Sequence, residues 1–336
     1  MKFEPINKIP GFKIGHAQDS EALTGCTVIL CDEGCVGGVD QRGGSPGTRE
    51  TDLLRPLHMV ETVNAILLTG GSAFGLDAAG GVMKYLEEHH QGVNVGPTVV
   101  PIVPTAVLMD LTIGSYSIRP DQAMGYQACL NASADSPKQG NYGAGTGGTV
   151  GKILGMDHCM KGGIGHAACE LEPGIWVGAI VAVNSLGDVV DPDNRNILAG
   201  AQLVDESAAD KNNKILFADT LSILSGKTNQ KSLETVPVNN TVIGCVLTNV
   251  KLSKDEANKL AQCGQNGLVL SIQPAHTMFD GDTMFAISSQ RKNGNIHAVT
   301  AFAPIVVAQA IVNAIRFADS VGGIPAARDF LSTERE

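Results

Sequence analysis

The stretch TVIGCVLTNVKLSKDEANKLAQCGQNGLVL, residues 241–270, places an apolar run directly before a helical pattern. Its first ten residues, Thr241 to Val250, are rich in β-branched side chains, which predicts a buried strand. Ser253 is followed by Glu256 three residues later, and this capping box predicts the start of a helix. One face of that helix carries Ala257, Leu260, Ala261 and Leu268. The stretch is therefore predicted to form a buried strand followed by an amphipathic helix.

The same order continues toward the C-terminus. Met284 to Ile287 is another short apolar run and predicts a second buried strand. After Pro304, the residues from Ile305 to Phe317 are apolar around most of a helical circumference, which predicts a helix buried between layers. From residue 241 onward the chain is therefore expected to run strand, helix, strand, helix.

Three further apolar runs lie earlier in the chain and predict buried strands: Thr27 to Leu30, Ala65 to Leu68 and Val177 to Val183. A helix is predicted to begin with Ser72 as its N-cap and to end in the polar residues 87–90. Its expected apolar face is formed by Phe74, Ala78, Val82 and Leu86. Such an alternation suits a parallel doubly wound sheet, but strands and helices in separate layers give much the same order. The pattern alone leaves both open.

The composition excludes several classes of protein. Of the 336 residues, 43% are hydrophobic and 17% charged, which is the balance of a globular chain with a sizeable core. The formal net charge is −10, and no basic cluster with interleaved aromatics offers a footprint for nucleic acid. The N-terminus has no continuous apolar signal region, and we identify no stretch long and apolar enough to span a bilayer. We therefore expect a cytoplasmic protein with no membrane partner and with reduced cysteines.

The segment from Asp191 to Val238 differs from the rest of the chain because it is polar, with runs such as DPDNRN, DESAADKNNK and SGKTNQKS. It ends directly before NNTVIG, which begins at residue 239. A polar segment of this kind is the best candidate in the chain for a mobile, protease-accessible or self-cleaved region.

Two glycine-rich motifs resemble known sites but fail their spacing. Residues 143–152, GAGTGGTVGK, resemble a phosphate-binding P-loop, yet Thr146 stands at the first glycine position and Ile153 replaces the magnesium-binding hydroxyl. Residues 70–74, GGSAF, resemble a nucleophile elbow, yet Phe74 occupies its second glycine position, and helix capping accounts for the serine. Histidines and cysteines show no zinc-site spacing, so neither a metal nor a cofactor is expected.

Thr241 lies at the junction between the polar segment and the apolar strand. If the bond before a threonine is cut, its new α-amine, with an unperturbed pKa of about 7.7–8.0, can act as the base for its own hydroxyl. Threonine also begins many strands simply because it is β-branched. From local sequence alone, a structural threonine is the more economical interpretation.

Five segments, which follow one another in a recognisable order along the chain, favour a catalytic role for Thr241 over a structural one. They are TGGSAFGLDAAGGVMKYLEE (69–88), VPIVPTAVLMDL (100–111), GAGTGGTVGK (143–152), NNTVIG (239–244) and PAHTMFDGDTMFA (274–286). Together they resemble the DmpA/P1 peptidase family, which includes β-aminopeptidases and the nylon-oligomer hydrolase, and the likeness runs across most of the chain. The resemblance implies an α+β fold, a four-layer αββα sandwich like that of DmpA and ornithine acetyltransferase, with residues 1–336 in a single domain.

The resemblance also implies self-cleavage between Asn240 and Thr241, which would give chains 1–240 and 241–336 and leave Thr241 as the N-terminal nucleophile. The family's other active-site positions fall on Lys152, Asn184, Asp280 and Asp282. A lysine can keep the neighbouring amine deprotonated by like-charge repulsion, and an asparagine amide can donate to an oxyanion. The two aspartates can hold the threonine amine and hydroxyl in line.

One position departs from the family pattern. Where relatives can place a tyrosine that polarises the substrate carbonyl, this sequence has Met109 as the corresponding substrate-binding residue, which offers no comparable donor. We expect an aminopeptidase or amidase that acts on small peptides or aminoacyl amides, assembled as a homo-oligomer of cleaved units. Two alternatives stay open: an acyltransferase of the ornithine acetyltransferase type, and a non-catalytic member that binds a small molecule.

Overall fold

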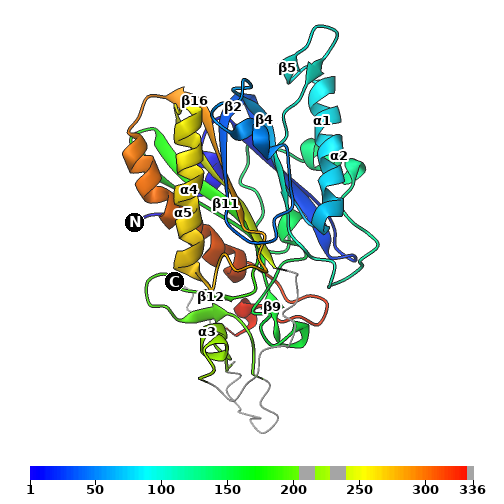
Figure 1. Ribbon diagram of the computed structural model, residues 1–336, viewed down its shortest axis with the longest axis vertical. Coiled ribbons are helices and arrows are strands. Elements are labelled where there is room, and N and C mark those ends of the chain that lie inside the picture. Colours follow the sequence, from blue (N-terminus) through cyan, green and yellow to red (C-terminus); the bar gives the residue numbers. More distant parts are fainter. Residues whose placement is uncertain (204–215, 228–239, 331–336) are drawn as a thin grey trace.

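The computed structural model describes residues 1–203, 216–227 and 240–330, and its centre is a pair of stacked sheets (Figure 1). The strand order along the path is β10-β11-β14-β16-β2-β4-β7-β3, and β1 pairs with β2. The strands of the first sheet are β10 (Gly163–Glu172), β11 (Ile175–Asn184), β14 (Thr241–Val250), β16 (Thr283–Lys292) and the second half of β2 (Thr24–Gln41). β14 and β16 are parallel, whereas β11 and β14 are antiparallel.

The second sheet shares the long strand β2 with the first. Residues Cys26–Leu30 of β2 pair with two strands of this sheet, one on each side, and residues Val36–Gln41 pair with β16 of the first sheet. The other strands of this sheet are β1 (Phe12–Asp19), β4 (Val63–Thr69), β7 (Thr105–Val107) and β3 (Thr48–Arg49). One continuous strand therefore joins the two sheets.

Helices cover the outer face of each sheet (Figure 1). α4 (Lys254–Ser271) and α5 (Ile296–Arg316) pack on the first sheet, and α1 (Ala78–Glu88) and α2 (Gln122–Leu130) pack on the second. Three clusters of buried apolar residues fill the spaces between the four layers, one under each helix pair and one between the sheets. The predicted αββα sandwich is therefore confirmed, and the doubly wound alternative is excluded.

Shorter elements complete the chain. The two-residue strands pair as β5 (Val93–Asn94) with β6 (Val99–Val100) and β8 (Thr149–Val150) with β9 (Met160–Lys161). β12 (Asp188–Val190) pairs with β13 (Ile197–Ala199) and β15 (Ile272–Gln273). The remaining helix α3 spans Thr220–Leu224, and 3-10 turns occur at Ile6–Lys8, Thr51–Leu54, Ser72–Asp77, Gly143–Gly145, Met156–His158 and Ala327–Asp329.

The five predicted strands and the capping box are confirmed, but α5 begins earlier than predicted. Its first residue is Ile296, capped by the Asn295 side chain, which accepts from the His297 amide at 2.9 Å. Pro304 lies inside the helix and not at its start. A proline inside a helix removes one backbone hydrogen bond. Here ten buried apolar residues on the same helix offset that loss.

The predicted capping role of Ser72 is wrong. The chain enters a 3-10 turn at Ser72 before α1 begins, and no side chain caps either start. Gly71 and Ser72 both have left-handed backbone angles, with φ of 81° and 53°. Phe74 is 62% exposed with the Arg119 guanidinium 3.9 Å above its ring, so it does not belong to the buried face.

The expectation that no segment could span a membrane also needs correction. By length and composition α5 could cross one, with a mean hydropathy of 1.9 over its apolar window. In the structure this helix packs against α4 and strands β10 and β11. The core helix of a globular protein can have the same length and hydropathy as a membrane-spanning helix. Its apolar composition is explained by its packing in the helix layer on the first sheet.

The polar segment from Asp191 to Val238 lies partly outside the described residues, which omit 204–215 and 228–239. Its described parts contain β13 and α3. The prediction that it is a mobile or cleaved region therefore stays a prediction.

Candidate active site

Thr241 is the first residue of β14, a central strand in which all ten residues are buried. Its neighbour across the antiparallel pairing with β11 is Asn184, the last residue of that strand. On the other side, β16 starts at the same end of the sheet because it runs parallel to β14. The turn that precedes β16, residues 276–282, therefore lies beside Thr241. Strand pairing alone brings three predicted site residues, Asn184, Asp280 and Asp282, to one edge.

Lys152 and Asn184 form a buried polar pair next to the nucleophile. The Lys152 ammonium donates to the Asn184 side-chain oxygen at 2.8 Å and to its main-chain oxygen at 3.1 Å. The same side-chain oxygen accepts from the amide and hydroxyl of Thr149 at 3.0 and 3.2 Å. The Asn184 amide nitrogen donates to the carbonyl of Met109 at 2.9 Å. The predicted residues Lys152, Asn184, Met109 and Thr241 thus belong to one cluster.

Burial changes the acid–base behaviour of Lys152. Because its side chain has no exposed surface, desolvation lowers its pKa to about 7, against the opposing influence of Cys159 and Asp280. A lysine with this pKa is present partly as the neutral amine at neutral pH. It can then accept a proton, which an ordinary lysine cannot do.

The two aspartates shape the turn before β16. Asp282 accepts from the Val242 amide at 2.8 Å with one carboxylate oxygen. With the other it accepts from the His276 amide at 2.9 Å and lies 3.0 Å from the His276 ring. Asp280 accepts from the amide of Thr277 at 3.0 Å, and burial together with the charge of Asp282 raises its pKa to about 6.

These contacts differ from the role that the resemblance implied. Among the described contacts, neither carboxylate bonds to the Thr241 hydroxyl; Asp282 instead holds the next residue, Val242, and Asp280 holds the turn. The hydroxyl of Thr241 donates to the carbonyl oxygen of Asn240. The amide of Gly281 donates to that same oxygen at 3.2 Å. The aspartates therefore act on the intact chain by fixing the backbone around the Asn240–Thr241 bond.

A glycine-rich loop after β2 clamps the same turn, and sequence reasoning missed it. The amides of Arg42, Gly44 and Ser45 donate to carbonyls of the turn at 3.0, 3.1 and 2.8 Å. A Cβ on Gly43 would lie 2.2 Å from the carbonyl oxygen of Asp280, so this close approach requires glycine. The three glycines of residues 42–47, RGGSPG, were the available signal.

A cavity of about 160 Å³ opens beside Thr241. Its walls come from the loop after β2, the turn after β4 and the end of β7, and include Ser45, Ser72, Met109 and Phe279 with Asn240 and Thr241. Met109 lines this cavity, and its expected contact with substrate stays a prediction. Ser72, set aside in the sequence as a helix cap, is a wall residue, and its left-handed backbone is a strained conformation of the kind found at functional sites.

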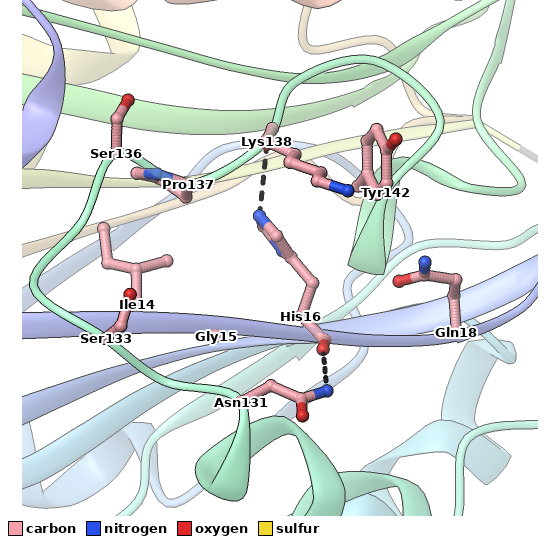
Figure 2. A pocket seen from close by; sticks show the side chains of 10 residues that line it. All are labelled: Ile14, Gly15, His16, Gln18, Asn131, Ser133, Ser136, Pro137, Lys138 and Tyr142. Carbon is pink, nitrogen blue, oxygen red and sulfur yellow. Dashed lines mark hydrogen bonds between the residues drawn. The ribbon is translucent and has the colours of Figure 1, made fainter.

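Figure 2 shows a larger cavity, of about 350 Å³, over strand β1. Its floor is His16, whose ring bonds the Lys138 carbonyl at 3.1 Å and the Thr27 hydroxyl at 2.9 Å. Burial lowers the pKa of His16 to about 4, so the ring is neutral and both nitrogens are engaged. None of the predicted site residues lines this cavity. Its histidine is therefore a structural one.

Across the described ranges, no group of three or more His, Cys, Asp or Glu residues is arranged to hold a metal ion. The polar groups around Thr241 are a lysine, an asparagine, two aspartates and main-chain amides, which suit amide-bond chemistry carried by a hydroxyl nucleophile.

Comparison with known proteins agrees with this geometry. The pattern of peptidase family S58 matches residues 4–328. An uncharacterised aminopeptidase of Mycobacterium leprae (strain TN) is 41% identical over 344 residues, covering 95% of this chain and 92% of that protein. The 6-aminohexanoate-oligomer endohydrolase of Paenarthrobacter ureafaciens is 30% identical over 284 residues, covering 83% of this chain and 73% of that protein.

The fold is shared with solved structures. The L-aminopeptidase D-Ala-esterase/amidase of Ochrobactrum anthropi, described as a new variant among the Ntn hydrolase fold, superposes with a TM-score of 0.69 at 19% identity. The match covers 96% of this chain and 88% of that one. The layered arrangement of helices and sheets is therefore the fold of that structure.

Proposed function

Because the chain belongs to peptidase family S58 and is thus an amide hydrolase, we propose that it cuts its own Asn240–Thr241 bond and then hydrolyses small peptides or aminoacyl amides through an ester on Thr241. One observation carries the proposal. The Thr241 hydroxyl contacts the carbonyl of the bond to be cut, at the start of a buried strand and beside a pair formed by Asn184 and a lysine of pKa about 7.

The first step is an N→O acyl shift. The Thr241 hydroxyl oxygen bonds to the carbonyl carbon of Asn240 while its proton passes to the neutral amine of Lys152. The carbon–nitrogen bond then breaks, the Thr241 amine takes the proton back, and Asn240 is left as an ester on Thr241. Water hydrolyses this ester, which yields chains 1–240 and 241–336 and a free Thr241 hydroxyl.

Turnover uses the new N-terminus. The α-amine of Thr241, with an unperturbed pKa of about 7.7–8.0, accepts the hydroxyl proton when a substrate carbonyl is attacked. A positive charge on Lys152 lowers the pKa of that amine by like-charge repulsion. Asn184 lies across the strand pairing from Thr241, and a side-chain amide in this position can donate to the oxyanion.

The substrate class follows from the size of the cavity and the relatives. A cavity of about 160 Å³ suits a small acyl group. Two relatives carry the names uncharacterised aminopeptidase and 6-aminohexanoate-oligomer endohydrolase, and these names support peptides or aminoacyl amides as substrates. We further propose a cytoplasmic homo-oligomer of cleaved units, in keeping with the high apolar content of the chain.

The intact mass of the purified protein under denaturing conditions tests the self-cleavage. Wild type should give two chains, the smaller beginning Thr-Val-Ile-Gly-Cys, whereas Thr241→Ala should give one uncut and inactive chain. Thr248→Ala is the matched control, because Thr248 is a buried threonine of the same strand whose hydroxyl bonds the Trp176 carbonyl at 2.7 Å. Thr241→Ala protein that still matures and hydrolyses amides would refute the mechanism.

A second measurement separates hydrolysis from acyl transfer. Aminoacyl amide substrates are incubated with the cut protein in the presence and absence of an amine acceptor. We expect the free acid in both cases. A product joined to the acceptor as the main species would instead indicate transferase chemistry on the same ester.

A further inference from the structure

Gly281 lies between the two aspartates of the turn and touches the bond that is to be cut. Its amide donates to the carbonyl oxygen of Asn240 at 3.2 Å, through a bridge that aligns residue 240 with residue 280. The side chains on both sides hold this amide in place, because Asp280 bonds Thr277 and Asp282 bonds Val242. The position of the Gly281 N–H is therefore fixed from two directions.

The space around Gly281 leaves no room for a side chain. A Cβ there would lie 2.9 Å from the Thr241 hydroxyl oxygen and 2.7 Å from the carbonyl oxygen of Ser45. The backbone of Gly281 is not left-handed, so its conformation does not by itself demand glycine. Glycine is required here because the nucleophile occupies the space that a side chain would take.

We propose that the main-chain N–H of Gly281 is the oxyanion donor for cleavage of the Asn240–Thr241 bond and for the later hydrolysis of substrate, an inference that rests on the proposed function. When the Thr241 oxygen bonds to the carbonyl carbon, the carbonyl π electrons move onto the Asn240 oxygen. The Gly281 N–H already points at that oxygen. A fixed donor at developing charge lowers the barrier without reorganisation.

The same donor serves turnover because the acyl group stays on the same hydroxyl. The ester on Thr241 carries its carbonyl where the Asn240 carbonyl was, and each substrate acyl group then takes that place. Gly281 approaches from the β16 side of Thr241 and Asn184 from the β11 side. The nucleophile thus lies between a main-chain donor and a side-chain donor on its two neighbouring strands.

The direct test removes the N–H and keeps the shape. Glycolic acid is placed at residue 281 of the full chain by nonsense suppression in cell-free synthesis, which turns the Gly281 amide into an ester. The matched control carries glycolic acid at Gly323, a turn position with open space around it. Self-cleavage is followed by intact mass over time, at a temperature where all chains are folded by circular dichroism.

We expect the 281 ester to cut itself about 100- to 1,000-fold more slowly than wild type, as when one oxyanion-hole donor is removed. The 323 control should cut at the wild-type rate. Cleavage of the 281 ester within threefold of wild type would overturn the inference and leave the proposed function standing. Wild type that never cuts itself would overturn the proposed function first.

Gly281→Ala gives an independent reading. The added Cβ must displace the Thr241 hydroxyl or the Ser45 carbonyl, so we expect a folded chain that stays uncut. Gly80→Ala is its control, because that Cβ would meet only the flexible Gln122 side chain, at 3.1 Å. A Gly281→Ala chain that cuts itself as fast as wild type would also overturn the inference.

Discussion

Two regions of the molecule each bury a lysine completely, and they use it differently. Lys161 donates to three main-chain carbonyls, those of Gly145, Gly148 and Gly162, at 3.1, 2.8 and 2.9 Å. Lys152 donates to both oxygens of Asn184, the residue that faces Thr241 across the sheet. The first lysine holds a glycine-rich turn together, and the second is bonded to the residue that pairs with Thr241.

The difference shows how burial can serve either structure or chemistry. Burial lowers the pKa of both amines to about 7. Three carbonyls around Lys161 match the three donors of an ammonium and favour its charged form, assisted by the nearby Asp110. Lys152 instead donates to Asn184, the residue that pairs with Thr241 across the sheet, so of the two lysines it is the one linked to the nucleophile. We therefore expect Lys152 to be the lysine that exchanges protons.

The largest expected effect comes from Lys152→Met, which removes the proton acceptor and keeps the volume. Self-cleavage should slow by about 100- to 10,000-fold, the usual contribution of a positioned base. Stability should change by less than about 1 kcal/mol, because Asn184 still accepts from Thr149 and a buried charge has been removed. Intact mass over time gives the rate, and urea unfolding in a Thr241→Ala background gives the stability of the uncut chain.

Lys161→Met is the matched control and should show the reverse pattern. It removes one donor from each of three buried carbonyls, of which those of Gly145 and Gly148 keep a main-chain donor, so we expect a loss of about 1–3 kcal/mol in the free energy of unfolding. At temperatures where the variant is folded, self-cleavage should stay within threefold of wild type. If Lys161→Met abolished cleavage in a fully folded chain while Lys152→Met did not, our assignment of the two lysines would be reversed.

The pH dependence of stability gives the smallest and sharpest comparison. A lysine whose pKa falls from 10.5 unfolded to about 7 folded binds fewer protons in the folded state between those values. The free energy of unfolding should therefore rise with pH in this window, by about 1 kcal/mol per pH unit for one such lysine. Because both lysines have the same lowered pKa, we expect Lys152→Met and Lys161→Met each to remove about half of this rise between pH 8 and 9 in the Thr241→Ala background. A variant that kept the full slope would show that its lysine has an ordinary pKa in the folded chain.

Local pattern predicted the elements that depend on neighbouring residues. Strand Thr241–Val250 and the Ser253–Glu256 capping box are found at the predicted residues, because a continuous apolar run and a three-residue spacing are properties of short segments. The start of α5 and the role of Ser72 were predicted wrongly. Both depend on what the segment packs against, since burial of α5 outweighs the proline and the Ser72 turn follows the cavity wall.

The candidate site divides in the same way. The residues Lys152, Asn184, Asp280, Asp282 and Thr241 came from the resemblance of motifs to a family, and the structure brings them to one end of β14. No local signal indicated that the Gly281 amide would meet the Asn240 carbonyl, and the glycines of residues 42–47 did not show that their loop would clamp the turn before β16. Main-chain donors carry no identity in the sequence, so a search for reactive side chains passes over them.

By itself, then, the sequence determined the buried strands, the capped helix and the order of motifs, because hydrophobic periodicity and helix capping act over a few residues. Only the tertiary structure decided which turn lies beside Thr241. The antiparallel pairing with β11 brings Asn184 to the start of β14, and the parallel pairing with β16 brings Gly281 there. Such pairings join residues far apart in the chain, and burial of both sheets between helices selects them.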